Sequence, residues 1–134
     1  APLPLGAILR TNPVMLPFTA DRALPGFMEW VGGEKFDADD PVAQVIMATL
    51  RDYKTALPAP QLFTDEQLRS LSVPALVVVG GRSVIHDPRR ALERARALIP
   101  GVRAELWPDA THSIAGQFAD EVDAKLLDFV DEVE

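Results

Sequence analysis

Cysteine is missing from this sequence, since none of its 134 residues is a cysteine. The absence excludes disulfide scaffolds, cysteine nucleophiles and zinc sites built on thiolates. Long hydrophobic runs are missing too, because no apolar stretch approaches the roughly 18 residues that a transmembrane helix needs. The first five residues, APLPL, lack the basic start of a signal peptide. We therefore expect no membrane-spanning segment and a cytoplasmic location.

Basic residues are few compared with acidic ones. The chain has 13 lysines and arginines against 20 aspartates and glutamates, which gives a formal net charge of −7. A nucleic-acid binder needs a basic face to displace counterions from phosphate, and an anionic membrane attracts basic clusters. The charge therefore argues against both kinds of partner. The two histidines, His86 and His112, lack a carboxylate at metal-ligand spacing, so we expect neither a metal nor a cofactor.

The sequence does contain enough apolar residues for a folded domain, because 48% of its residues are hydrophobic. Its first half is rich in proline and predicts helices separated by breaks. Asp40 can cap one helix, and Thr64 with Gln67 has the form of a capping box that begins another. Three helices are expected in this half: one over 20–31 that ends at Gly32-Gly33, one over 41–54 and one over 64–71. The second of these should present one apolar face, formed by Val42, Val45, Ile46, Thr49, Leu50 and Tyr53.

The second half changes its period and predicts strands as well as helices. A β-branched apolar run ends at Gly80 and is typical of a strand that is buried on both faces of a parallel sheet. The expected order is a strand over 73–79, a helix over 87–99, a strand over 102–107, a loop over 108–114 and a helix from about 117. This order indicates an α/β sheet. Two strands alone leave open edges, so we expect them to be one end of a larger sheet.

The same residues resemble the C-terminal half of the α/β-hydrolase family. The resemblance rests on the segments VPALVVVG at 73–80, DPRRA at 87–91, IPG at 99–101, PDATHS at 108–113 and LDFV at 127–130. It implies an α/β fold that is the C-terminal portion of an α/β-hydrolase, with two parallel strands, flanking helices and a helical cap. Residues 70–134 would then be the C-terminal part of the core, and residues 1–69 the cap, or lid, segment.

The resemblance implies that His112 is the catalytic histidine, which takes a proton from a serine and returns it to the leaving group. In the family an aspartate usually stands at the third position after the glycine that ends the first of these strands, but here Ser83 stands there. Asp87 is a displaced candidate for this acid, although its place before Pro88 favours an N-cap. Asp109 is expected in a turn. The acid could also come from a strand that precedes Ala1.

The serine nucleophile of the family has no counterpart in this sequence. The serines stand at 70, 72, 83 and 113, and none forms a G-x-S-x-G elbow. In the family that elbow and the oxyanion loop lie upstream of the matched segments. We therefore expect the chain, which begins at Ala1 rather than Met, to be a C-terminal portion, either a proteolytic fragment or a truncated form. Alone it should not turn over an ester.

These observations leave three hypotheses about function. The first is a fragment of a serine hydrolase that cleaves a small carboxylic ester or a related carbonyl substrate. The second is a non-catalytic module that binds a ligand or a protein, which Ser83 at the acid position favours. The third is a complete natural chain whose partner supplies further strands, and the open sheet edge predicts self-association or domain exchange. Five apolar residues could line a substrate cavity or simply fill the core: Phe18, Phe27, Met28, Trp30 and Met47.

Overall fold

The computed structural model describes residues 5–15, 19–52 and 61–134 of the chain, which divides into two compact units. One unit contains residues 62–134 and the other residues 3–61. The division lies eight residues before the boundary expected at 69/70, so residues 62–69 stand with the strands. That residues 1–69 form a cap stays a prediction.

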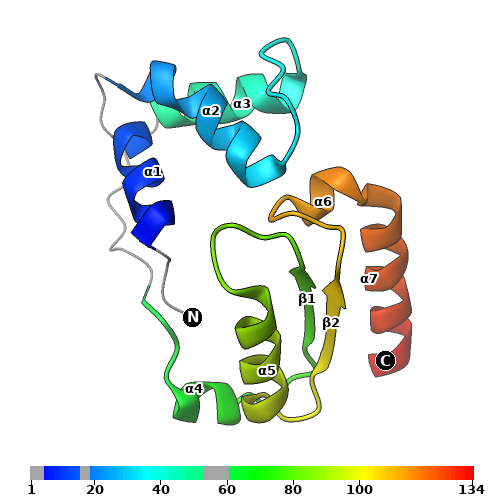
Figure 1. The fold of residues 1–134 in the computed structure, drawn as a ribbon. Helices are drawn as coiled ribbons and strands as arrows, with labels where there is room; N and C mark the ends of the chain where they lie inside the picture. The colour runs from blue at the N-terminus through cyan, green and yellow to red at the C-terminus, as the bar shows by residue number, and fades with distance from the viewer. Residues whose placement is uncertain (1–4, 16–18, 53–60) are drawn as a thin grey trace. The chain divides into compact units, whose positions relative to one another are not determined.

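In its described part, the unit of residues 3–61 contains three helices, α1 (Leu5–Met15), α2 (Ala20–Gly32) and α3 (Pro41–Asp52). Helix α2 packs against both of its neighbours (Figure 1). Small and branched apolar side chains form its core, because the buried hydrophobic residues are Ala7, Val14, Leu24, Val31 and Ala43. Apolar packing of α2 against α1 and α3 therefore stabilises this unit.

The ends of α2 and α3 follow the local chemistry of the sequence. Gly33 adopts a φ of 74° and ends α2, and its N–H donates to the carbonyl oxygen of Glu29. Only glycine takes up this left-handed conformation without steric cost. Asp40 Oδ1 accepts hydrogen bonds from the N–H groups of Val42 and Ala43, at 2.8 and 2.9 Å. The predicted cap of α3 and the predicted end of α2 are confirmed.

Helix α1 was not among the expected elements. It contains Pro13, and a proline removes one N–H donor from the helical ladder, which is why the segment predicts breaks instead. The faces of the predicted helices also differ from a simple apolar stripe. In α3 the small Ala43 is buried, while Val42 and Val45 are each 66% exposed. Tyr53, at the end of the expected helix, lies outside the described residues.

The unit of residues 62–134 contains the two described strands and the other described helices. In chain order these are α4 (Asp65–Arg69), β1 (Leu76–Gly80), α5 (Pro88–Leu98), β2 (Arg103–Trp107), α6 (Ile114–Gln117) and α7 (Ala119–Val133). Both bonds of the capping box between Thr64 and Gln67 are present at the start of α4. Strands β1 and β2 run parallel, with Leu76 paired to Arg103 and Gly80 to Trp107. The α/β fold with two parallel strands and flanking helices is confirmed.

Helices flank the strand pair on both sides (Figure 1). Helix α5 packs against β1 and β2 and contributes Leu92, Ala95 and Leu98 to the buried core. On the other side, α7 lies over a hollow of about 250 Å³ whose lining includes Leu76 and Val78. Burial on both faces was expected along β1, but only its end, Val79 and Gly80, is buried.

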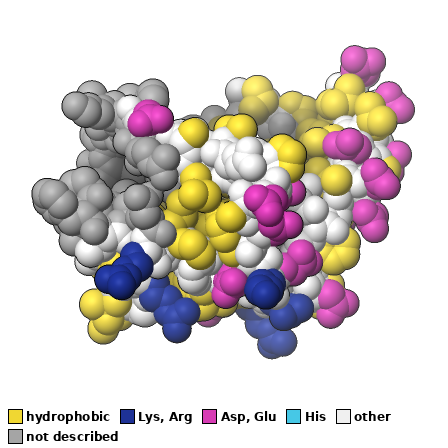
Figure 2. All heavy atoms as spheres, turned by 90° about the horizontal axis from the view of Figure 1, so that it is seen from above, with side chains coloured by type: hydrophobic (Ala, Val, Ile, Leu, Met, Phe, Trp, Pro, Cys, Tyr) yellow, Lys and Arg dark blue, Asp and Glu magenta, His cyan; other side chains and the backbone are white. Residues whose placement is uncertain are grey.

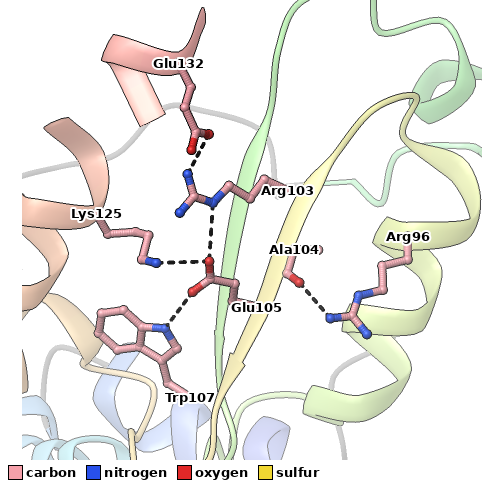
Figure 3. A network of polar contacts seen from close by, with 7 residues as sticks. All are labelled: Arg96, Arg103, Ala104, Glu105, Trp107, Lys125 and Glu132. Atoms are coloured by element: carbon pink, nitrogen blue, oxygen red, sulfur yellow. Dashed lines mark hydrogen bonds and ion pairs between the residues drawn. The ribbon is translucent and has the colours of Figure 1, made fainter. Parts of the chain in front are cut away.

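A polar network ties α7 to β2 (Figure 3). Glu105 accepts hydrogen bonds from Lys125 Nζ at 3.1 Å, from Trp107 Nε1 at 3.3 Å and from Arg103 Nε at 3.4 Å. Arg103 also pairs with Glu132 at 2.7 Å. The hydrogen bond from Lys125 is the main cause that holds the pKa of Glu105 below its usual range. Charged groups therefore fix the helix whose apolar side chains are only partly covered.

Large hydrophobic side chains remain on the surface of the chain. Leu5 and Leu9 of α1 are 72% and 62% exposed, and Leu127 of α7 is 67% exposed. Figure 2 shows hydrophobic side chains among acidic ones on its visible face. Across the described ranges, no helix combines the length and the apolar character needed to cross a bilayer.

Candidate active site around His112

The parallel pairing brings two loops to the same end of the strands. Gly80 and Trp107 are partners at the carboxyl ends of β1 and β2. The loop 81–87 therefore begins beside the loop 108–113 (Figure 1). Backbone hydrogen bonds join the two loops, from Gly81 N to the Trp107 oxygen at 2.8 Å and from Arg82 N to the Ala110 oxygen at 2.9 Å. Ligand sites in open α/β sheets lie at this carboxyl edge.

Two glycines allow the loops to approach each other this closely. A Cβ on Gly80 would collide with the carbonyl oxygen of Thr111 and would lie 2.9 Å from that of Ala110. A Cβ on Gly81 would lie 2.7 Å from the carbonyl oxygen of Pro108. All of these neighbours are backbone atoms, which cannot turn away as a flexible side chain can. The glycine pair is therefore a requirement of the site.

The loop that carries His112 is anchored at the two residues just before the histidine. Ala110 is fully buried and Thr111 is 3% exposed. Gln117 Oε1 accepts hydrogen bonds from the Thr111 N–H at 2.8 Å and from the Thr111 hydroxyl at 2.7 Å. The buried and hydrogen-bonded residues Ala110 and Thr111 thus fix the backbone that carries His112, whose own side chain is exposed.

His112 meets Ser83 and His86 across the two loops. Ser83 Oγ lies 3.2 Å from His112 Nδ1 and 3.4 Å from His86 Nδ1. The two imidazole rings lie edge to face, with centroids 5.6 Å apart and planes at 76°. Ser83 therefore stands at the position where the resemblance leads one to expect the acid, and it contacts the expected histidine. The catalytic role of His112 stays a prediction.

His86 is half-buried, unlike His112. Burial lowers the pKa of His86 below its usual value, and the charge that His112 can carry lowers it further. The nearby carboxylate of Asp87 acts in the opposite direction. The neutral imidazole is consequently the favoured form of His86 near neutral pH, and a neutral ring offers one donor and one acceptor.

Asp87 caps helix α5. Its Oδ1 accepts a hydrogen bond from the Arg90 N–H at 3.1 Å, and Pro88 follows at the first helical position. The capping prediction is confirmed. The described contacts of Asp87 do not include a hydrogen bond to His112. Its role as the acid stays a prediction, and Asp109 lies in a turn as expected.

Sequence reasoning gave His86 no role, and this is the residue that it missed. The spacing of three between Ser83 and His86 is the only local signal, and such a spacing in a turn has no fixed geometry. The contact depends on the backbone turn in which Ser83 N donates to the Gly80 oxygen at 3.1 Å. Across the whole described part of the chain, this cluster included, no three histidine, aspartate or glutamate residues gather as they would around a metal ion.

Two hollows lie near the expected functional residues. One of about 290 Å³ adjoins the His112 loop and is lined by Trp107, Pro108, Asp109, Ala110, Phe118 and Glu121. It contains none of the three clustered side chains, so we do not assign substrate to it. A second, of about 320 Å³, lies inside the helical unit and is lined partly by Phe27 and Met28. Trp30 instead contacts Phe27 and Arg10, and Phe18 lies outside the described residues.

Curated proteins similar to this chain are mostly carboxylesterases. The carboxylesterase YbfK of Bacillus subtilis (strain 168) is 25% identical in an alignment 138 positions long, which covers 95% of this chain and 47% of that protein. The uncharacterised carboxylesterase nap of the same bacterium is 39% identical over 70 residues, 52% of this chain and 23% of that protein. A non-heme haloperoxidase of Rhodococcus erythropolis is 33% identical over 69 residues, which are 52% of this chain and 25% of that protein. No protein-family model matches.

Solved structures give the same result for the fold. The naproxen esterase, or carboxylesterase NP, of Bacillus subtilis matches with a TM-score of 0.77 and 25% identity over 96% of this chain and 46% of its own. Carboxylesterase CesB (YbfK) of the same species matches with a TM-score of 0.77 and 24% identity over 96% and 46%. The chain thus spans about half the length of these relatives. The expected resemblance is confirmed: over that half, the chain is similar in sequence and in fold to carboxylesterases with the α/β-hydrolase fold.

Proposed function

We propose that this chain is the portion of a carboxylic-ester hydrolase that carries the catalytic histidine, His112, and that the serine nucleophile comes from residues outside it. In this role Nε2 of His112 takes the proton of the serine hydroxyl during attack on the ester carbonyl. It then gives the proton to the departing alcohol. The carboxylesterases that the chain resembles support this reaction class.

One observation carries the proposal. His112 is exposed at the carboxyl edge of the parallel strands, while its Nδ1 lies 3.2 Å from Ser83 Oγ on the neighbouring loop. A histidine acting as a general base needs one nitrogen held by the protein and the other free to meet the reacting group. The contact with Ser83 holds Nδ1 of His112, and the exposure of the His112 side chain allows Nε2 to meet the reacting group.

The test uses the complete gene product in which this chain occurs. Short aryl esters are assayed with the wild type and with His112→Ala, and Asp109→Asn on the same loop is the matched control. We expect the His112 variant to lose at least about a hundredfold in kcat, since general acid–base catalysis contributes about 10²–10⁴-fold. The control should keep its rate. Activity retained in His112→Ala would refute the proposal.

A second candidate function rests on Ser83. A hydroxyl cannot balance the charge of an imidazolium as a carboxylate does, so the fold could serve as a ligand-binding module without turnover. This candidate predicts that the complete wild-type protein binds aryl esters in equilibrium dialysis and leaves them intact. Hydrolysis by the wild type would exclude it.

The partner and the location belong to the same proposal. Among the described residues β1 pairs with β2 alone, so its other edge presents unpaired backbone groups. We propose that the rest of the hydrolase sheet covers this edge, and that in its absence two copies of the chain associate there. A cytoplasmic location stays a prediction.

A further inference from the structure

The cluster at the strand ends contains three groups that can form hydrogen bonds but no carboxylate. Ser83 Oγ lies within reach of two imidazole nitrogens, His112 Nδ1 at 3.2 Å and His86 Nδ1 at 3.4 Å. A serine hydroxyl has one proton and two lone pairs, whereas a neutral imidazole has one N–H and one bare nitrogen. These limits restrict how the protons can be arranged.

If both contacts are made while the rings are neutral, the protons can be arranged in three ways, because the Ser83 oxygen can accept from one imidazole or from both. In the first arrangement His112 Nδ1–H donates to Ser83 Oγ, and the Ser83 hydroxyl donates to His86 Nδ1. In the second the direction is reversed, and His112 then carries its proton on Nε2. In the third, both Nδ1–H groups donate to the Ser83 oxygen. The first and third arrangements leave His112 Nε2 bare, as a general base requires. Of these two, only the first also gives the Ser83 proton an acceptor within the cluster.

We propose that Ser83 and His86 are positioning residues that orient His112 through the relay His112 Nδ1–H to Ser83 Oγ–H to His86 Nδ1, in place of an acid. The inference rests on the proposed function for its consequence in catalysis, but the relay itself is a property of the described residues. His86 serves as the final acceptor and carries its own proton on Nε2.

The surroundings of His86 suit a neutral acceptor. Its ring is half-buried, and burial lowers its pKa, so that the ring stays uncharged near neutral pH. Were His86 protonated, its Nδ1 would become a donor and could no longer accept from Ser83. The carboxylate of Asp87 lies near this ring, and its Oδ1 accepts a hydrogen bond from the Arg90 N–H at 3.1 Å.

The relay differs from a carboxylate in strength. A hydrogen bond to a charged acceptor is about twice as strong as one between neutral groups. A neutral chain of hydroxyl and imidazole therefore fixes the tautomer and the ring plane of His112 but stabilises its imidazolium less. The relay is accordingly a device for orientation.

The first experiment reads the tautomers directly. Ring nitrogens of the ¹⁵N-labelled chain are observed by two-bond proton–nitrogen NMR correlations at a pH where both imidazoles are neutral. We expect the Nδ1–H tautomer for His112 and the Nε2–H tautomer for His86. In Ser83→Ala the Nδ1–H population of His112 should fall while His86 stays as it is. Ser72→Ala, at an exposed serine outside the cluster, should leave both unchanged.

The second experiment measures catalysis in the complete gene product. Ser83→Ala should lower kcat by about tenfold to a hundredfold, the cost typical of losing a group that orients a functional residue, with KM nearly unchanged. Ser83→Thr keeps the hydroxyl and should restore most of the rate. A Thr variant as slow as the Ala variant would contradict a role for the hydroxyl.

The two proposals fail in different ways. The relay is overturned if His112 carries the Nε2–H tautomer, if His86 carries the Nδ1–H tautomer, or if the His112 tautomer does not respond to Ser83→Ala. None of these results changes the outcome expected for His112→Ala. Full activity in His112→Ala would refute the proposed function while the tautomers could still be as expected. Each result therefore bears on one proposal.

Discussion

At the scale of single residues, the site depends on what is absent at position 80 as much as on what is present at 83, 86 and 112. The space beside Gly80 is filled by carbonyl oxygens of the loop that carries His112. Any side chain there must move backbone, and the loop that would move is the one whose position brings His112 to Ser83. Stability and site geometry are therefore linked at this glycine.

Gly80→Ala should destabilise the strand-containing unit by about 1–3 kcal/mol, because overpacking against fixed backbone costs this much. Urea unfolding followed by circular dichroism measures the loss. Gly116→Ala is the matched control, since a Cβ at Gly116 meets nothing within 4 Å. In the short helix α6, alanine there should be neutral or stabilising. Equal stability of the two variants would contradict the close approach at Gly80.

Two substitutions separate the contribution of the capping oxygen of Asp87 from the contribution of its negative charge. Asp87→Ala removes the cap of α5 and should cost about 1 kcal/mol of stability. Asp87→Asn keeps a capping oxygen and should stay near the wild type in thermal unfolding. Loss of esterase activity in the stable Asn variant would instead assign Asp87 the role of the acid.

At the scale of elements, α7 is positioned by charge more than by burial. None of its described side chains is fully buried, whereas Glu105 of β2 binds Lys125, and Glu132 of α7 binds Arg103 (Figure 3). Partly solvated ion pairs contribute little individually, but a network that shares one carboxylate is sensitive to the protonation of that group.

Glu105 should make the fold sensitive to acid. Its folded pKa lies below the ordinary value of 4.5, chiefly because of the hydrogen bond from Lys125. The stability that it contributes is thus fully present above about pH 4.5 and is lost as the pH falls through the folded pKa. Glu105→Gln should lose less stability than the wild type as the pH falls from about 5 to about 3 in urea titrations, by about 1 kcal/mol or less. Glu93→Gln, outside the network, should follow the wild type, and parallel curves for all three would contradict this expectation.

Local signals predicted the elements better than they predicted burial or the site. Three features could be predicted from the sequence because each depends on a few neighbouring residues: the capping box at Thr64, the cap at Asp87 and the end of α2 at Gly33. Helix α1 was missed because Pro13 predicts a break. The burial of α3 was not readable, since which side chains are covered depends on the neighbouring helices.

The site was readable in part. A family resemblance pointed to His112 and to the position of Ser83. The contact of His86 with Ser83 could not be predicted, because it depends on a turn shaped by the close approach of two loops. Periodicity and motif spacing carry no information about such a turn.

At the scale of the whole molecule, an open strand edge is the dominant feature. Such an edge is a template for further pairing, and within the described residues β1 offers one. We expect the isolated chain to associate with increasing concentration in sedimentation velocity experiments. Because backbone pairing and apolar contact would drive this, added salt should not reverse it. A monomer at every concentration would contradict the expectation.

The pairing of Gly80 with Trp107 also constrains which length changes the chain can accept. Each residue added to a strand advances the rest of that strand by about 3.3 Å and turns the next side chain to the opposite face. An insertion within β2 would carry the imidazole of His112 away from Ser83. An insertion in the turn at 99–102 would leave the strand register and the positions of both loops unchanged. Insertions and deletions should therefore be tolerated before the amino-terminal ends of the strands. Within the strands and up to the loop that carries His112, they should be rare because they displace the histidine.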